Sequence, residues 1–303
     1  MFSPPAPPPP PAPPPPLLSP SPPLFSKDSN QKETTVLLKN YSPNDFRSLL
    51  AKELPHSNFR FQCYMPDSIV NGVLQQGPCC GIVALHLALV QVDYHRERVS
   101  TSYDPTISSV TSASISAIME MAKSKKYTTY GEMFSCDDML SLSRDFLAAS
   151  ANVTLDSCIE KNRRDFVEMM KNHFRNGGVA LVPYDKDVDF RPCTKNGTCA
   201  HWALLVGMVS VSLEGDFTGK KEIGGTEEMI PLETDFVAAR HGKSLKIAFW
   251  NVDDLLSSNE QLLDYDWDKL RRESRFDDHS LEPVIPVDGL DKGLKGKMIF
   301  IRI

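Results

Sequence analysis

One cysteine of this chain stands in a setting that would activate its thiol. Cys80 lies in the run Gln75-Gln76-Gly77-Pro78-Cys79-Cys80-Gly81, and a largely apolar stretch, Ile82–Val90, follows it. Proline is tolerated in a first helical turn, so we expect a buried helix after Pro78 with the two cysteines at its N-terminal end. Unpaired amides and aligned dipoles there favour the nucleophilic thiolate. The pattern predicts Cys80 as a nucleophile; the alternative is two structural cysteines in a core helix.

Residues beside Cys80 could assist acyl transfer. Gln75 lies five residues before Cys80, where its amide could join the Cys80 backbone N–H in binding an oxyanion. Gln76 is the weaker candidate for that role. Gly77 and Gly81 would relieve crowding and allow a substrate backbone to come close.

A general base is needed to take the thiol proton, and His201 is our candidate. It opens the strand-like run Trp202–Val206, 121 residues after Cys80 (201 − 80). A strand would hold the imidazole on rigid backbone. Because a single histidine at a strand edge is often structural, the assignment depends on its order along the chain relative to the cysteine and to a third polar group.

The third group should orient the imidazole. Lys246–Trp250 reads as a strand that delivers Asn251 at its end, and Asn251 is our choice. Asp253 and Asp254 are alternatives, since strand ends are uncertain by about two residues from sequence. Asn251 could also be a simple turn residue. Cysteine at a helix start, then histidine, then a polar residue at strand ends is the papain-like arrangement.

The elements that must hold these residues predict an α+β fold. We expect a papain-like cysteine protease fold, in which a central buried helix carrying the nucleophile packs against an antiparallel sheet. Residues 213–243, rich in Gly, Glu and Thr, are expected to form a long surface excursion. Helical patterns cover residues 44–54, 107–121, 136–149 and 166–174, and strand-like runs cover 178–182, 202–211, 245–250 and 297–303.

The first 25 residues differ from the rest in composition. Fourteen of the 24 prolines lie between Pro4 and Pro23, and Pro7–Pro16 is broken only by Ala12. We expect a disordered proline-rich tail over residues 1–25, a linker over 26–45 and a papain-like catalytic domain over 46–303. Polyproline II is a ligand for aromatic-lined grooves, so residues 4–23 predict binding to profilin or another polyproline-binding domain. The alternative is a flexible spacer.

Charge and cysteine count argue against several classes of protein. The net charge is −6, and the short basic runs lie near acidic residues, which argues against a nucleic-acid surface. The longest apolar stretch, around residues 200–211, is well short of the roughly 20 residues that cross a membrane, and no secretory signal is visible. Seven cysteines, an odd number, suit a reducing compartment, so we expect a cytoplasmic protein.

These motifs together resemble the actin maturation protease family, a set of papain-like cysteine proteases. In that family the nucleophile is the cysteine immediately before the glycine, which corresponds to Cys80. The family has aspartate where this chain has Asn251. The resemblance implies a cysteine aminopeptidase that removes the N-acetylated first residue of immature actin through a thioester, exposes the acidic mature N-terminus and needs no cofactor or metal. It rests on the proline-rich N-terminus, Leu74–Gly81, His201–Leu204, Phe249–Asn251 and Ser258–Leu262.

Other functions fit parts of the sequence. Cys193, Cys199 and His201, with Cys79 or Cys80, could form a zinc site, although Cys-x5-Cys-x-His lacks the usual close ligand pairs. A catalytically inactive adaptor could bind through the polyproline tail alone. An acyltransferase would use the same pairing of cysteine and histidine.

Overall fold

A computed structural model describes residues 38–54, 58–99, 113–147, 149–223, 226–266, 268, 272 and 282–302. The chain divides into two units, Met1–Thr35 and Val36–Ile303, and every element below belongs to the second. The tail expected over residues 1–25 lies outside the described residues. Part of the segment read as linker is ordered, because it contains strand β1 (Leu38–Asn40) and the start of helix α1 (Pro43–Leu50).

Seven strands form one sheet in the order β4-β9-β5-β6-β7-β8, and β2 also pairs with β6. All the described pairings are antiparallel, including the separate pair of β1 with β3 (Ser68–Val70). Strand β6 is the longest, and one of its edges pairs first with β5 and further along with β2. The seven strands are β2 (Phe59–Tyr64), β4 (Asn152–Ser157), β5 (Val179–Asp185), β6 (Ala200–Ile223), β7 (Thr226–Arg240), β8 (Ala248–Asn251) and β9 (Lys297–Arg302).

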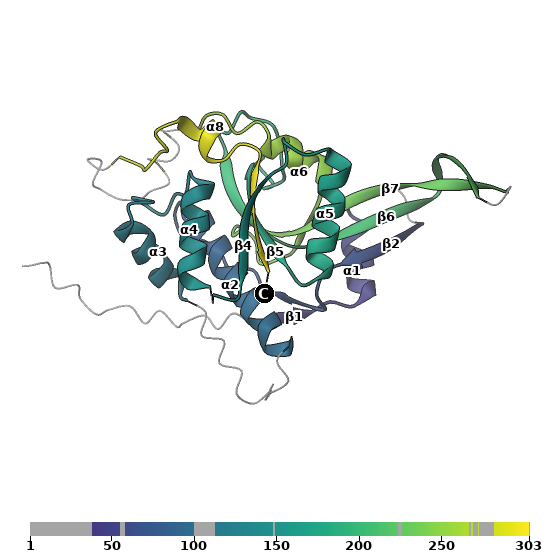
Figure 1. The fold of residues 1–303 in the computed structure, drawn as a ribbon, viewed down its shortest axis with the longest axis horizontal. Coiled ribbons are helices and arrows are strands. Elements are labelled where there is room, and N and C mark those ends of the chain that lie inside the picture. Colours follow the sequence, from purple (N-terminus) through teal and green to yellow (C-terminus); the bar gives the residue numbers. More distant parts are fainter. Residues whose placement is uncertain are drawn as a thin grey trace, which may run out of the picture. The chain divides into compact units, whose positions relative to one another are not determined.

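Side chains alternate along β6 between two hydrophobic cores, as the pleat of a strand requires. Trp202, Leu204 and Val206 belong to the first core, whereas Ala203 and Leu205 belong to the second. The first core is shared with helices α2 (Cys80–Val99), α3 (Ile115–Ser124) and α4 (Cys136–Phe146). The second core is shared with α5 (Arg163–Arg175) and α6 (Val252–Asn259). Helices α2 and α5 thus cover opposite faces of the sheet (Figure 1).

Helix α2 is the buried helix that the sequence predicted. It begins at Cys80, two residues after Pro78, and Ile82, Leu85 and Leu87 are 0% exposed. It packs on β5 and β6 and against α3 and α4. A helix apolar on all sides is stable only in the middle of a domain, and this surrounding packing holds its first residue in place.

Residues 213–243, expected to form a long surface excursion, are mostly paired strand. Strands β6 and β7 pair as a long hairpin from Leu204↔Arg240 to Ile223↔Thr226, with register shifts on the way. Figure 1 shows the two strands running together away from the other elements. The end of β7 is core, because Phe236–Arg240 are buried and Phe236–Ala239 pair with β8. The Gly, Glu and Thr content of the hairpin concealed this strand.

Most of the other helices and strands expected from the sequence are confirmed, and four strands were not expected. Helices α1, α4 and α5 and strands β5, β6, β8 and β9 lie where the patterns predicted them. Helix α3 covers the end of the helix expected over residues 107–121, and residues 107–112 lie outside the described part. Strands β1, β2, β3 and β4 were not expected. In β2 the apolar residues at every second position, Phe59, Phe61 and Cys63, could have predicted it.

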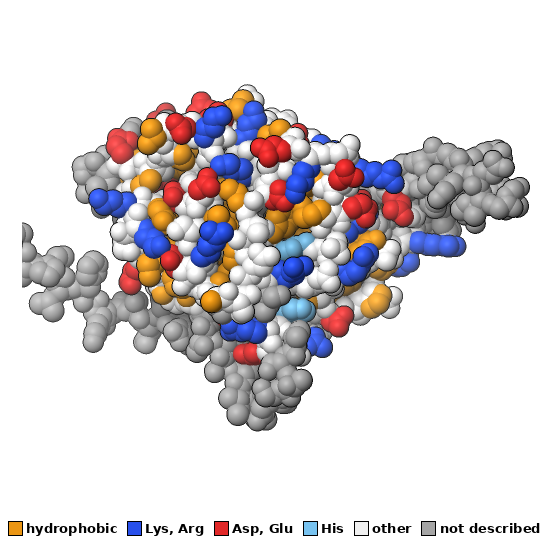
Figure 2. Space-filling model, in the orientation of Figure 1, with side chains coloured by type: hydrophobic (Ala, Val, Ile, Leu, Met, Phe, Trp, Pro, Cys, Tyr) orange, Lys and Arg blue, Asp and Glu red, His pale blue; other side chains and the backbone are white. Residues whose placement is uncertain are grey.

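The surface carries both signs of charge. Figure 2 shows lysine and arginine side chains interspersed with aspartate and glutamate on the face in view, without a large patch of one sign. None of the described helices combines the length and apolar character needed to cross a bilayer.

Candidate active site

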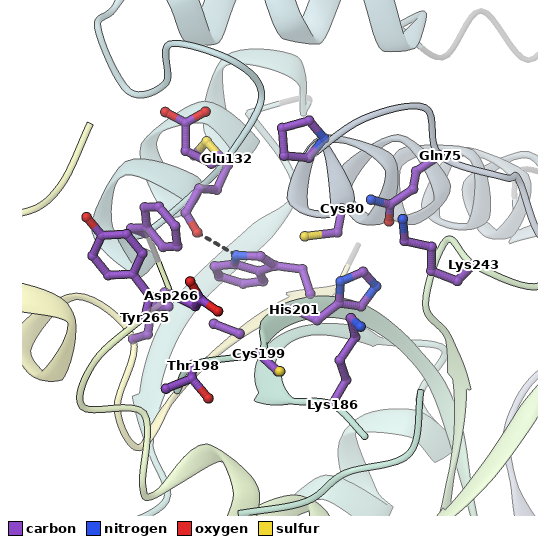
Figure 3. A pocket seen from close by; sticks show the side chains of 16 residues that line it. Gln75, Cys80, Glu132, Lys186, Thr198, Cys199, His201, Lys243, Tyr265 and Asp266 are labelled. Carbon is purple, nitrogen blue, oxygen red and sulfur yellow. Dashed lines mark hydrogen bonds between the residues drawn. The ribbon is translucent and has the colours of Figure 1, made fainter. Parts of the chain in front are cut away.

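A pocket lies where the start of α2, the start of β6 and the loop after β7 meet (Figure 3). Cys80 and His201 both line it, although they are far apart in sequence. Gln75 and Lys243 line the same pocket. The structure therefore brings together the predicted nucleophile, the predicted base and the predicted oxyanion residue.

Cys80, not Cys79, is the cysteine of the pair that lines the pocket. The Cys79 side chain is 5% exposed, and its thiol donates to the Gln76 carbonyl at 3.1 Å. Gln76 itself is exposed and does not line the pocket. Successive side chains at a helix start point about 100° apart, so only one of two adjacent cysteines can face a given cavity.

The two glycines near Cys80 act in different ways. Gly77 has a φ of +74°, the left-handed region that glycine adopts readily, and it turns the chain ahead of Pro78. A Cβ atom on Gly81 would lie 2.8 Å from Met139 Cε and 3.0 Å from Met133 Cβ. Gly81 therefore makes room for core side chains and not, as we expected, for a substrate backbone.

Burial keeps the Cys80 thiol protonated. Desolvation raises the pKa of Cys80 to about 11, although the backbone amides of Trp202 and Gly81 and the charge of Lys243 act in the opposite direction. The Gly81 amide at the helix N-terminus acts in the direction that the sequence predicted, but desolvation has the larger effect on the pKa of Cys80. The effect of the Trp202 amide also shows that the sulfur lies near the backbone next to His201.

His201 is held by a backbone carbonyl. Its Nε2 lies 2.7 Å from the His241 carbonyl oxygen. A carbonyl can only accept, so Nε2 carries the hydrogen and Nδ1 is left with a lone pair, able to accept a proton. Burial is the main cause that lowers the pKa of His201 to about 3, and the charges of Lys186 and Lys243 add to it. The resting imidazole is therefore neutral.

Gln75 is fixed at both its backbone and its side chain. Its backbone N–H donates to the Gly242 carbonyl at 2.8 Å, and its Nε2 donates to the Gly77 carbonyl at 2.8 Å. Nε2 carries a second hydrogen. The Gln75 Oε1 atom is buried without a hydrogen-bond partner among the described residues.

The structure does not bring Asn251 to His201. The Asn251 side chain caps helix α6, accepting from the Asp253 backbone N–H at 2.7 Å. Asp253 forms an exposed ion pair with Arg163 at 2.6 Å, and Asp254 lies in the same first turn of α6. None of these three side chains lines the pocket.

A buried carboxylate organises the segment just before His201. Asp185, at the end of β5, is 0% exposed. It accepts from the backbone N–H groups of Lys195 at 2.7 Å, Gly197 at 2.9 Å and Cys199 at 2.8 Å. These three bonds fix the turn that leads into β6.

The motif Ser258–Leu262 supports that carboxylate from α6. The Gln261 Nε2 donates to Asp185 Oδ2 at 3.1 Å, and its Oε1 accepts from the Asn196 backbone N–H. The Ser258 hydroxyl accepts from the Asp185 backbone N–H at 2.8 Å and donates to the Asp185 carbonyl at 2.9 Å. This motif, none of whose residues line the pocket, therefore holds the histidine-bearing segment in place.

Sequence reasoning missed several residues of the site. The His241 carbonyl could not have been found, because a backbone acceptor leaves no trace in residue type. Lys243 was hidden in the segment read as an excursion. Asp185 could have been suspected as a lone acid that ends a strongly apolar strand, since such an acid needs partners when buried.

The zinc alternative finds no support in the geometry. Across the described residues, no three or more histidine, cysteine, aspartate or glutamate side chains are grouped so as to hold a metal ion. Cys193, Cys199 and His201 are therefore not gathered as ligands. All seven cysteines are free thiols.

Fold and pocket together define an α+β protein with a cysteine and a histidine gathered where a buried helix meets an antiparallel sheet. Residues 70–209 match the family described as actin maturation protease-like, C-terminal domain. Over 267 residues the chain is 26% identical to the actin maturation protease of Xenopus tropicalis, covering 85% of this chain and 80% of that protein. The chain is a homologue of the actin maturation proteases, which confirms the resemblance seen in its motifs.

Other relatives carry the same name. The Drosophila melanogaster protein is 32% identical over 200 residues, which cover 65% of this chain and 57% of that protein. The Homo sapiens protein is 28% identical over 247 residues, which cover 76% and 63%. A crystal structure titled SERA5E from Plasmodium falciparum matches 59% of this chain and 81% of its own, with 11% identity and a TM-score of 0.30, too weak a likeness to bear on the fold.

Proposed function

We propose that this chain is a cysteine protease of the aminopeptidase type that removes the N-acetylated first residue of immature actin. The observation that carries the proposal is the shared pocket of Cys80 and His201, in which the His241 carbonyl leaves Nδ1 as the basic nitrogen. The name of the relatives supports the choice of substrate. A buried helix that carries the cysteine against an antiparallel sheet supports a papain-like fold.

In the first half of the reaction, the Cys80 sulfur attacks the carbonyl carbon that follows the acetylated residue's Cα. The thiol proton passes to His201 Nδ1, so the thiolate forms during attack, in line with the raised pKa of Cys80. The tetrahedral intermediate collapses when the imidazolium returns the proton to the leaving nitrogen. The shortened chain departs with a free amino group, and the acetylated residue remains as a thioester.

In the second half, water attacks the thioester. His201 takes a proton from the water and returns it to the sulfur as the thioester breaks, so that the acetylated amino acid leaves as a carboxylic acid. In both halves the Cys80 backbone N–H and the second N–H of Gln75 Nε2 stabilise the oxyanion. Neither half requires a metal or a cofactor.

The proline-rich segment has a separate role in this proposal. Residues 4–23 bind profilin or another polyproline-binding domain, and the catalytic unit works in the cytoplasm, where its seven thiols stay reduced. Recruitment of a profilin–actin complex would raise the local concentration of substrate without new contacts in the pocket.

The test is mass spectrometry of an acetylated, acidic actin N-terminal peptide after incubation with the purified protein. We expect release of the acetylated first residue. Cys80→Ala should abolish it, and Cys79→Ala is the matched control, which removes the same atom from the neighbouring buried thiol and should retain most activity. Equal loss in both variants would contradict the assignment of Cys80.

Two further measurements separate this function from the alternatives. Gln75→Ala should slow turnover by about 100-fold or more if its amide stabilises the oxyanion, and an unchanged rate would assign that role to the backbone or to Gln76. Stoichiometric zinc in the purified protein would favour a metal site. An intact peptide despite a folded protein would favour the adaptor.

A further inference from the structure

The pocket differs in charge between its two ends. Figure 3 shows Lys243 and Lys186 on the same side of the pocket as His201, whereas Glu132, Tyr265 and Asp266 lie on the other side of Cys80. The charge of Lys243 acts on both Cys80 and His201, and the charge of Lys186 acts on His201. Two cations therefore lie near the predicted base.

The opposite end of the pocket is largely apolar. Met133 and Leu294 are 2% and 1% exposed, and the rings of Phe134 and Tyr265 pack with their centroids 4.9 Å apart. Glu132 does not offer a free charge there, since it is 2% exposed and accepts from the backbone N–H groups of three residues. Those residues are Thr129 at 2.9 Å, Tyr130 at 2.7 Å and Val284 at 3.2 Å.

The position of His201, the predicted base, determines which part of a bound peptide lies at each end of the pocket. The imidazole that deprotonates the thiol must afterwards protonate the leaving nitrogen, so the leaving part of the peptide lies on the His201 side. The acyl part then lies toward the apolar end. The residue directly after the cleaved bond is accordingly the one that approaches the lysines.

We propose that Lys243, on the same side of the pocket as Lys186, forms a cationic subsite that selects an acidic residue immediately after the cleaved bond, while the apolar end takes the acetylated residue. This inference rests on the proposed function and adds the residue of this chain that recognises the second substrate residue. The apolar lining at the other end, formed by Met133, Phe134 and Leu294, disfavours an acidic side chain bound the wrong way round, which fixes the direction of the peptide.

Lys243 is the residue of choice for a test, because the loop also carries a matched control. Lys243 is half-buried in the pocket, and the exposed Lys246 lies three residues further on, outside the pocket. Substitution at either position makes the same change in net charge. Only the change at Lys243 should alter the preference for the second residue.

The experiment measures kcat/KM for three acetylated peptides with methionine first and aspartate, asparagine or lysine second. We expect the wild-type chain to prefer aspartate over asparagine by about 5- to 10-fold, the effect of a partly exposed charge pair. In the Lys243→Gln variant the aspartate and asparagine peptides should have equal kcat/KM values. The Lys243→Glu variant should prefer the peptide with lysine second, and Lys246→Glu should keep the wild-type preference for aspartate. High salt should reduce the preference, since it screens the pair.

A second measurement separates failure of this inference from failure of the proposed function. The same peptides are titrated against the Cys80→Ala variant, with and without Lys243→Gln, and their dissociation constants are compared. If no peptide is cleaved but the aspartate peptide binds more tightly through Lys243, the subsite holds and the proposed reaction fails. Equal cleavage and equal binding of all three peptides, or a ratio unchanged by Lys243→Glu, would overturn the subsite.

Discussion

Replacing Asp185 by asparagine tests how firmly the segment before His201 is held. The carboxylate accepts four hydrogen bonds, three from backbone N–H groups at 2.7–2.9 Å and one from Gln261 at 3.1 Å. An asparagine has only one accepting oxygen. In the orientation that keeps most bonds, that oxygen replaces Oδ2 and serves Lys195, Gly197 and Gln261. The Cys199 N–H then faces an NH₂ group and has no acceptor.

The loss of stability follows from the number of hydrogen bonds that asparagine cannot accept. One buried donor left without an acceptor costs about 1–3 kcal/mol, and the remaining bonds lose the strengthening that the negative charge gave them. We therefore expect Asp185→Asn to lower the free energy of unfolding by about 2–4 kcal/mol. The lost anchor lies two residues before His201, so turnover should also fall by about 10-fold or more, because small displacements of catalytic groups are costly.

Urea unfolding and peptide turnover provide the assay, and Asp187→Asn is the control. Asp187 makes the same kind of bond, accepting from the backbone N–H groups of Asp189 and Arg191 at 2.8 Å each, but in an exposed turn where water can replace it. That variant should lose less than about 1 kcal/mol and little activity. Equal losses in the two variants, or a fully stable and active Asp185→Asn protein, would refute the anchoring role of Asp185.

Three further predictions follow from the site and the sequence. Asn251→Ala should cost about 1 kcal/mol through the lost cap of α6 but leave turnover within about twofold; a severe loss of turnover at unchanged stability would make Asn251 the orienter after all. His201 has a folded pKa of about 3 and an unfolded value near 6.5, so its contribution to stability is complete above the unfolded value and is lost as pH falls toward 3. When the pH falls from about 7.5 to 5.5, the free energy of unfolding measured in urea should decrease by about 1.4 kcal/mol more for the wild-type chain than for His201→Gln. The same pH dependence in both proteins would contradict this. Deleting residues 1–25 should leave peptide cleavage unchanged and slow cleavage of actin bound to profilin; equal slowing of both substrates would make the tail part of the fold.

The elements that carry Cys80 and His201 could be predicted from the sequence alone. The proline at residue 78 and the apolar run after it are local signals, so they predicted a buried helix that starts at the cysteines. The strand after His201 was equally readable from its apolar run, and the structure confirms both elements. Local propensity and the hydrophobic pattern act over a few residues and can be recognised without knowledge of the rest of the chain.

The groups that hold His201 and surround Cys80 come from distant parts of the chain and could not be predicted from the sequence. The acceptor of the imidazole N–H is a backbone carbonyl of His241, which any residue could have supplied, and it comes from a loop 40 residues away in the chain. The structure also shows that Cys80 lines the pocket, whereas the Cys79 thiol donates to the Gln76 carbonyl. The raised pKa of the Cys80 thiol reflects burial beneath distant elements, which outweighs the local helix end that sequence reasoning had invoked. Desolvation and long-range hydrogen bonds depend on how the whole chain packs, and for that reason no short motif reveals them.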